Sequence, residues 1–286
     1  MNRNSAGLKL TAVVLILVIA QFTLFAQSAA DFDYTMAQDG SGWVIEKYKG
    51  NAARVTIPAK IEGRQVVAIG SQAFTSNSTL TSVVIPEGVI RIEGGRIFQI
   101  EQTLYGLGAF SQCMNLASVK LPGSLTEIGR VAFFNCSSLA NITLPKNLSY
   151  IGEAAFSHSG LQKITIPGKV VKTQDAVFWA CKDLRSVVIP GSLEEINSTM
   201  FFDCTALNSV KLGEGVKIIG ENAFGGCTSL KTITIPKSIE AFMNMAFAGC
   251  SSLTTVKMPS SFSINLGSDI FRGCPLDSET ARIFFQ

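Results

Sequence analysis

The stretch that decides the fold is residues 210–230, which read VKLGEGVKIIGENAFGGCTSL. Its opening, Val210-Lys211-Leu212, places two apolar residues around a lysine, which is the alternation of a short strand with one buried face. An Ala-Phe pair and a cysteine follow at fixed distances. Variants of this unit begin nine times along the chain, at Val55, Val83, Val119, Ile142, Ile164, Val187, Val210, Ile233 and Val256.

The spacing of these units predicts a solenoid. From the third start onward the steps are 23, 22, 23, 23, 23 and 23 residues. A repeat this short cannot bury its own apolar face, so neighbouring units must stack. A proline usually ends each strand, because it lacks a backbone donor. We expect a turn glycine at Gly70, Gly129, Gly152 and Gly220, and an internal ladder of Phe74, Phe110, Phe133, Phe156, Phe178, Phe201, Phe224, Phe247 and Phe271.

The full pattern, Val/Ile-x-Ile/Leu-Pro followed by Ile-Gly-x-x-Ala-Phe-x-x-Cys-x-x-Leu, resembles the BspA-like, or treponemal-type, leucine-rich repeat family. The resemblance covers about residues 55–276. It implies a leucine-rich repeat solenoid of about nine coils of about 23 residues. A curved parallel sheet would form the concave face, with short helical or irregular segments on the convex face. Members are typically exported bacterial proteins associated with adhesion to host proteins or to other cells.

The N-terminus has the pattern of an export signal, residues 1–30. Arg3 and Lys9 precede a mostly apolar stretch, residues 10–25, and Ser28-Ala29-Ala30 offers small residues for cleavage before Asp31. A retained membrane anchor is the alternative, although this stretch of 16 residues is shorter than the roughly 20 that span a bilayer. The signal predicts a secreted, cell-surface or periplasmic protein.

The ends of a solenoid need caps, because terminal coils would otherwise expose core. We predict an N-terminal β cap at residues 31–54, a hairpin of Phe32–Met36 and Trp43–Tyr48. The repeats follow at residues 55–276, with a C-terminal cap at residues 277–286. Asp277-Ser278 can cap a short helix from Glu279 to Phe285, which would lay Ile283 or Phe284 on the last coil.

Composition argues against a disordered protein and against a general binder of nucleic acid or anionic lipid. Hydrophobic residues make up 47% of the chain and charged residues 16%, so there is ample material for a core and disorder is excluded. Without Arg3 and Lys9, 22 basic residues oppose 21 acidic ones. Such a balance gives no general attraction to nucleic acid or anionic lipid. The only predicted contact with a membrane is through the export signal.

The outward positions of the strands form one candidate binding surface for an acidic protein or a glycan. Thr and Val also suit an exposed strand by propensity, and Lys keeps a sheet soluble, so the alternative is a surface without a ligand. The candidate residues on this concave face, with flanking basic residues, are Lys120, Thr143, Lys163, Thr165, Arg185, Val188, Lys211, Lys231, Thr234 and Lys257.

An insertion in the second unit is the other candidate surface. Pro86 and Phe110 are separated by 13 residues more than in a regular unit, which places the insertion at residues 94–106. It is either a protruding recognition loop or a loop folded back over the first coils. A second alignment puts Phe98 in the ladder and the insertion at residues 99–108. The candidate contact residues are Ile97, Phe98, Ile100, Leu104 and Tyr105.

Seven cysteines occupy one column of the repeat, and Ser159 fills the position in the unit that lacks one. A reduced column of small hydrophobic side chains is our interpretation, and disulfides between neighbouring coils are the alternative. One ladder offers no tetrahedral cluster, so we predict neither a metal nor a cofactor. The column is Cys113, Cys136, Cys181, Cys204, Cys227, Cys250 and Cys274.

Catalytic patterns are poorly represented. His158 is the only histidine, so any Ser-His or Cys-His pair would depend on it, and we expect it to be a surface turn residue. We therefore predict an exported, non-catalytic, adhesin-like protein that binds a host matrix protein, a glycan or another cell surface. A spacer or self-assembling envelope protein without a specific ligand is the alternative, and an enzyme is the least supported.

Overall fold

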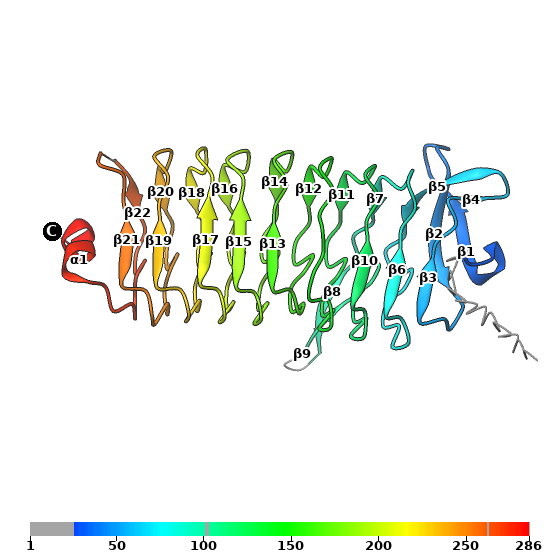
Figure 1. Ribbon diagram of the computed structural model, residues 1–286, viewed down its shortest axis with the longest axis horizontal. Helices are drawn as coiled ribbons and strands as arrows, with labels where there is room; N and C mark the ends of the chain where they lie inside the picture. Colours follow the sequence, from blue (N-terminus) through cyan, green and yellow to red (C-terminus); the bar gives the residue numbers. More distant parts are fainter. Residues whose placement is uncertain (1–25, 101–102, 262, 286) are drawn as a thin grey trace, which may run out of the picture.

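The computed structural model describes residues 26–100, 103–261 and 263–285, which form a β-solenoid of about nine turns (Figure 1). The predicted export signal lies outside the described residues except for residues 26–30. Gln27 in this remainder donates a backbone hydrogen bond to the Thr56 carbonyl, 2.9 Å away. Within the described ranges, no helix has both the length and the apolar character needed to cross a bilayer.

The Val-x-Ile segments form the predicted row of parallel strands. In β15, Val187 and Ile189 are buried while Val188 between them is half-buried, which is the expected alternation. Equivalent residues of successive coils pair directly, for example Val187 with Val210. The strands of this first row are β3 (Arg54–Thr56), β6 (Ser82–Val84), β10 (Ser118–Lys120), β13 (Lys163–Thr165), β15 (Ser186–Ile189), β17 (Ser209–Leu212), β19 (Thr232–Thr234) and β21 (Thr255–Lys257).

A second parallel row, which the sequence analysis did not predict, runs beside the first (Figure 1). Most of its strands hold only two residues, and the second is usually buried, as Ile128 and Ile151 are, with the exposed Leu266 of the last strand as the exception. After β2 (Trp43–Tyr48), the row consists of β5 (Arg64–Ile69), β7 (Arg91–Ile92), β11 (Glu127–Ile128), β12 (Tyr150–Ile151), β14 (Lys172–Thr173), β16 (Glu195–Ile196), β18 (Ile218–Ile219), β20 (Ala241–Phe242) and β22 (Asn265–Leu266).

The Ala-Phe segments that complete each coil are turns, not helices. Their phenylalanines form the predicted ladder, with neighbouring ring centroids 4.9–5.6 Å apart and ring planes within 13° of parallel. Tyr48 continues the column at the front, with its ring 5.3 Å from that of Phe74. The rings are buried, and each contributes about 2–3 kcal/mol by removal of apolar area from water.

The glycines before these turns have a different role from the one expected. Gly129 and Gly152 are absent from the positive-φ positions. Instead, a Cβ at either glycine would collide with backbone atoms of the preceding coil. Positive φ falls two residues before and two residues after the ladder phenylalanine, at Val131 and Asn135 around Phe133. Glycine is therefore required by the close approach of neighbouring coils.

Both ends of the stack are closed. At the front, β1 (Phe32–Met36) and β2 (Trp43–Tyr48) form the predicted antiparallel hairpin, and β2 pairs in parallel with β5. A short strand, β4 (Lys60–Ile61), pairs with β5, and a 3-10 turn, η1 (Ala29–Asp31), precedes β1.

At the back, the predicted helix is present as α1 (Ser278–Phe285). The Asp277 carboxylate accepts a hydrogen bond from the Thr280 backbone at 2.8 Å, which caps the first turn. Phe284 lies on the last coil, with its ring 4.7 Å from that of Phe271. Ile283 is exposed, so Phe284 is the residue that covers the end of the core.

Candidate binding surface

The structure brings the predicted outward residues together on one side of the first strand row, which we call the strand face. Lys120 lies beside Val84, and Val188 lies between Thr165 and Lys211 in the parallel register. Thr234 lies beside Lys257. Apart from the half-buried Val188, the predicted face residues are exposed: Lys120, Thr143, Lys163, Thr165, Arg185, Lys211, Lys231, Thr234 and Lys257.

The flanking basic residues do not all occupy the same position. Lys163 is two residues before Thr165 and pairs with Ser186, so it lies on the strand face itself. Arg185 and Lys231 are one position further back, in the turns that lead into β15 and β19. They border the strand face rather than forming part of it.

The strand face carries only one sign of charge. No outward position of the first-row strands holds an acidic residue, and Arg54, Lys120, Lys163, Lys211 and Lys257 are basic. The carboxylates beside it already have hydrogen-bond donors. Glu87 accepts from the Gly123 backbone at 2.8 Å, and this bond holds the pKa of its carboxyl below the ordinary value. Asp277 accepts from the Thr255 hydroxyl at 2.9 Å.

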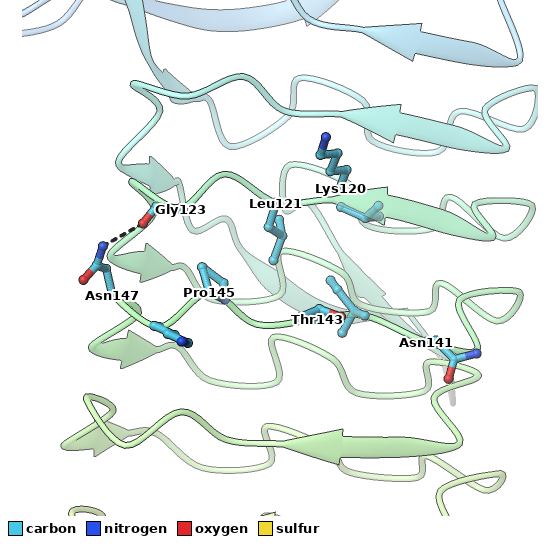
Figure 2. Close-up of a pocket in the computed structure, with 10 residues that line it drawn as sticks. Lys120, Leu121, Gly123, Asn141, Thr143, Pro145 and Asn147 are labelled. Atoms are coloured by element: carbon cyan, nitrogen blue, oxygen red, sulfur yellow. Dashed lines mark hydrogen bonds between the residues drawn. The ribbon is translucent and has the colours of Figure 1, made fainter.

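The strand face is interrupted in the fourth coil. Residues 142–144 occupy the strand position between β10 and β13 but form no strand. A hollow of about 560 Å³ lies on the β10 side and one of about 330 Å³ on the β13 side, and both are lined by Ile142, Thr143 and Lys146. Figure 2 shows Lys120, Leu121 and Thr143 around the larger hollow.

Two residues of the neighbouring loops hold the far side of the larger hollow. The Asn147 side-chain amide donates to the Gly123 carbonyl at 2.9 Å, the dashed line in Figure 2. Lys169 in turn donates to the Asn147 side-chain oxygen at 2.9 Å. The loops therefore stay tied together where the strands are not.

Sequence reasoning missed this interruption, although a signal was present. The step from Ile142 to Ile164 is 22 residues, one fewer than in the neighbouring units. In the other units two residues lie between the column cysteine and the closing leucine. In this unit Gly160 alone lies between Ser159, which replaces the cysteine, and Leu161, so the missing residue is here. A Cβ at Gly160 would collide with the Ser137 carbonyl oxygen. The shortened turn belongs to the coil whose segment, residues 142–144, forms no strand, although pairing is also absent between β17 and β19 across an ordinary step of 23 residues.

The insertion is a β-hairpin of β8 (Ile97–Ile100) and β9 (Thr103–Gly106), which projects from the stack in Figure 1. Ile97 at its base packs on Val131, Phe134 and Ala154, which belong to the coils after the insertion. At Ile97, therefore, the insertion contacts later coils, and the prediction that it folds back over the first coils is wrong for this residue. The other candidate contact residues of the insertion, Ile100, Leu104 and Tyr105, have side chains that are not among those the structure describes.

Phe98 pairs with Tyr105 across this hairpin and is 39% exposed. It does not join the ladder, because Phe74 and Phe110 stack directly on each other with centroids 4.9 Å apart. The alignment that placed Phe98 in the ladder is wrong, and the alignment with an insertion at residues 94–106 is confirmed.

The cysteine column lies in the core beside the ladder. Each thiol donates a hydrogen bond to the carbonyl of a ladder phenylalanine in the preceding coil, as Cys136 does to Phe110 at 3.2 Å. Burial raises the pKa of the Cys113 thiol to about 12. Among the described residues, no group of three or more His, Cys, Asp or Glu side chains is arranged to hold a metal ion.

His158 is not the surface turn residue that we expected. It is half-buried, with its ring 5.4 Å from Phe134 and 5.1 Å from Trp179. Its Nδ1 lies 2.9 Å from the hydroxyl of Ser157, which is fully buried and donates its proton to the Trp179 carbonyl. A side chain with no exposed surface, such as that of Ser157, is out of reach of a substrate, and burial lowers the pKa of His158. The pair is a packing contact, not a nucleophile and its base.

Comparison with known proteins places this geometry in a family. The family model described as "BspA type Leucine rich repeat region" matches in six copies over residues 48–185, 103–216 and 174–283. Repeats of this class are generally non-catalytic binding scaffolds. No curated protein matches the chain.

Solved structures agree with the family model. The leucine-rich repeat protein of T. pallidum is 30% identical, with a TM-score of 0.62, over 72% of this chain and 91% of that protein. A leucine-rich repeat protein from Bacteroides ovatus is 22% identical, with a TM-score of 0.46, over 90% of this chain and 97% of that protein. The stacked turns, the phenylalanine ladder, the family model and the T. pallidum structure lead to one conclusion. The chain belongs to the BspA-type leucine-rich repeat family.

Proposed function

We propose that the protein is exported and acts as a non-catalytic, adhesin-like binding protein that holds an acidic protein or glycan partner on its strand face. The observation that carries this proposal is the absence of acidic residues from the outward positions of the first-row strands, where basic residues recur. Such a surface attracts anionic partners and raises their rate of association.

The geometry of the solenoid supports a partner of extended shape. Lys211 and Lys257 lie two coils apart, which corresponds to about 10 Å at the usual strand spacing. The charges therefore form a line along the stack, and a linear acidic segment or an anionic glycan chain matches it. Partners at a host extracellular matrix or on another cell surface meet this requirement, and residues 1–30 supply the route out of the cell.

The closed ends favour this function over self-assembly. End-to-end stacking requires an open terminal coil, whereas the β1–β2 hairpin covers the front and Phe284 covers the back.

Charge reversal tests the proposal. In the full chain, Lys120→Glu, Lys211→Glu and Lys257→Glu together should weaken binding to immobilised matrix proteins or anionic glycans at least about tenfold. The matched control reverses Lys60, Lys172 and Lys182, which are exposed but lie off the strand face. Equal binding by the two triple variants, both folded by circular dichroism, would exclude the strand face.

A further inference from the structure

The interruption at residues 141–144 leaves backbone groups open in the middle of the sheet. No backbone N–H or C=O of these four residues makes a hydrogen bond to any other described residue. On either side, β10 pairs with β6 and β13 pairs with β15, both away from the gap. Open donors and acceptors in a strand are a template for another strand.

The gap is hollow and reachable from solvent. Asn141 and Thr143 are exposed, and Thr143 lines the hollows of about 560 and 330 Å³ on its two sides. The core is also less covered here. Val119 and Leu144 are 9% and 7% exposed, whereas Val187 at the position equivalent to Val119 is 1% exposed. A ligand at this place would therefore bury apolar surface as well as polar groups.

The charges around the gap are all positive. Lys120 and Lys146 line the larger hollow, and Lys146 and Lys163 line the smaller one. No carboxylate lines either hollow. The nearby Glu87 is engaged with the backbone of Gly123. Glu87 also interacts electrostatically with Lys120, whereas Lys146 and Lys163 form no ion pair with another described residue.

We infer that the gap is a docking site for an extended acidic peptide segment of the partner protein. The inference rests on the proposed function and names the kind of partner and the place where it binds. The segment adds its backbone to residues 141–144, and its Asp and Glu side chains pair with Lys120, Lys146 and Lys163. A peptide fits better than a glycan, because the open backbone offers donors and acceptors in alternation, as a β-strand requires.

The test uses a fluorescent octapeptide of alternating Glu and Val, with binding to the full chain followed by fluorescence polarisation. The gap variant carries Lys120→Glu, Lys146→Glu and Lys163→Glu. The matched control carries Lys60→Glu, Lys172→Glu and Lys182→Glu, which change the charge by the same amount off the strand face. A strand-face variant, Lys211→Glu, Lys231→Glu and Lys257→Glu, changes the charge on and beside the strand face away from the gap. We expect the dissociation constant to rise at least about tenfold in the gap variant and less than threefold in the control.

Two further measurements address the backbone pairing. An octapeptide N-methylated at alternate residues keeps its charge but cannot pair on one edge, so its affinity should fall at least about tenfold. Amide hydrogen exchange at Ile142, Thr143 and Leu144 should be fast in the free protein and slow when the peptide is bound. Equal affinity of the methylated and unmethylated peptides would overturn the peptide assignment. It would also be overturned if heparin displaced the peptide by binding the same lysines and did not slow amide exchange at residues 142–144.

The variants also separate this inference from the proposed function. Loss of binding in the strand-face variant but not in the gap variant would refute the gap as the site and leave the strand face as the binding surface. Unchanged binding in the gap variant and in the strand-face variant would refute both. Loss in the gap variant, with an unchanged melting temperature and unchanged binding by the off-face control, supports both.

Discussion

The thiol of Cys204 donates a hydrogen bond to the backbone carbonyl of Phe178, one coil earlier, with Sγ and O 3.1 Å apart. Cys227 makes the same bond to Phe201 at 3.2 Å, and Cys250 makes it to Phe224 at 3.1 Å. Each of these carbonyls also accepts a backbone hydrogen bond within its own turn, as Phe178 does from Cys181 at 3.2 Å, so the thiol is its second donor. The cysteine column thus connects the ladder of one coil to the turn of the next.

Removing one thiol should therefore cost more than its small volume suggests. We expect Cys204→Ala to lower the free energy of unfolding by about 1–2 kcal/mol, since it removes one of the two donors to the Phe178 carbonyl and opens a small void. Ser159→Cys, which completes the column, should change it by less than about 1 kcal/mol. Urea unfolding measures both, and an unchanged midpoint for Cys204→Ala would contradict the role of the bond.

The thiols should be almost unreactive in the folded protein. A thiol reacts as its thiolate, and burial raises the pKa of Cys113 to about 12 and that of Cys181 to about 11. At pH 8 we expect negligible reaction with a disulfide reagent such as Ellman's reagent over minutes, and release of seven equivalents after unfolding in guanidinium. Fewer equivalents from the unfolded chain would reveal disulfides in the column.

The phenylalanine ladder should dominate stability. Phe224 is fully buried between Phe201 and Phe247, so Phe224→Ala should lower the free energy of unfolding by about 3–5 kcal/mol. Met114→Ala, at a side chain that is 52% exposed, is the control and should cost less than about 1 kcal/mol. Similar losses for the two variants in thermal unfolding would show that the ladder is not the main source of stability.

Close approach of neighbouring coils predicts opposite results for two glycines. A Cβ at Gly129 would collide with the Gly94 backbone, so Gly129→Ala should be destabilising by at least about 1–3 kcal/mol. Gly168 has no atom within 4 Å of such a Cβ and is not a positive-φ position. Gly168→Ala should be neutral or stabilising by up to about 1 kcal/mol, because it reduces the entropy of the unfolded chain. Chemical denaturation of both variants provides the comparison.

The C-terminal helix should respond to acid. Hydrogen bonds from Thr280, and then from Thr255, hold the pKa of the Asp277 carboxyl below its ordinary value. A depressed folded pKa stabilises the helix above the unfolded pKa, and this contribution is lost as pH falls through the folded value. The protection factor of the Ala281 amide, which donates to the Asp277 carbonyl, should fall below about pH 4. Asp277→Asn keeps the cap but removes the titration, so its exchange should lack this acid step.

Repetition explains why so much of the fold could be predicted from sequence. The alternation of Val187 and Ile189 around Val188 recurs in unit after unit. A strand pattern that repeats so often is not a chance match, as it could be in a single unit. The second row was missed because strands such as β11 and β12 hold only two residues, too few to show any period. The role of Gly129 was misjudged because close approach between coils leaves no trace in a single sequence.

The candidate surface was predictable only in part. Lys120, Thr143 and Thr165 could be assigned to one face because their positions within the unit are equivalent. Loss of pairing around Thr143 depends on the length of the turn at Gly160 and on the contacts of two neighbouring coils. His158 was misassigned for a related reason, since its burial comes from Phe134 and Trp179 in adjacent coils.

The hairpin of β8 and β9 leaves the stack without disturbing it. Phe74 and Phe110 are 36 positions apart in the chain, yet their rings stack as closely as those of Phe133 and Phe156, which are 23 apart. The spacing between neighbouring coils is therefore unchanged by the insertion at residues 94–106. This junction is a ready insertion point for a foreign epitope or tag, which the rigid scaffold would display while its own thermal unfolding stayed unchanged.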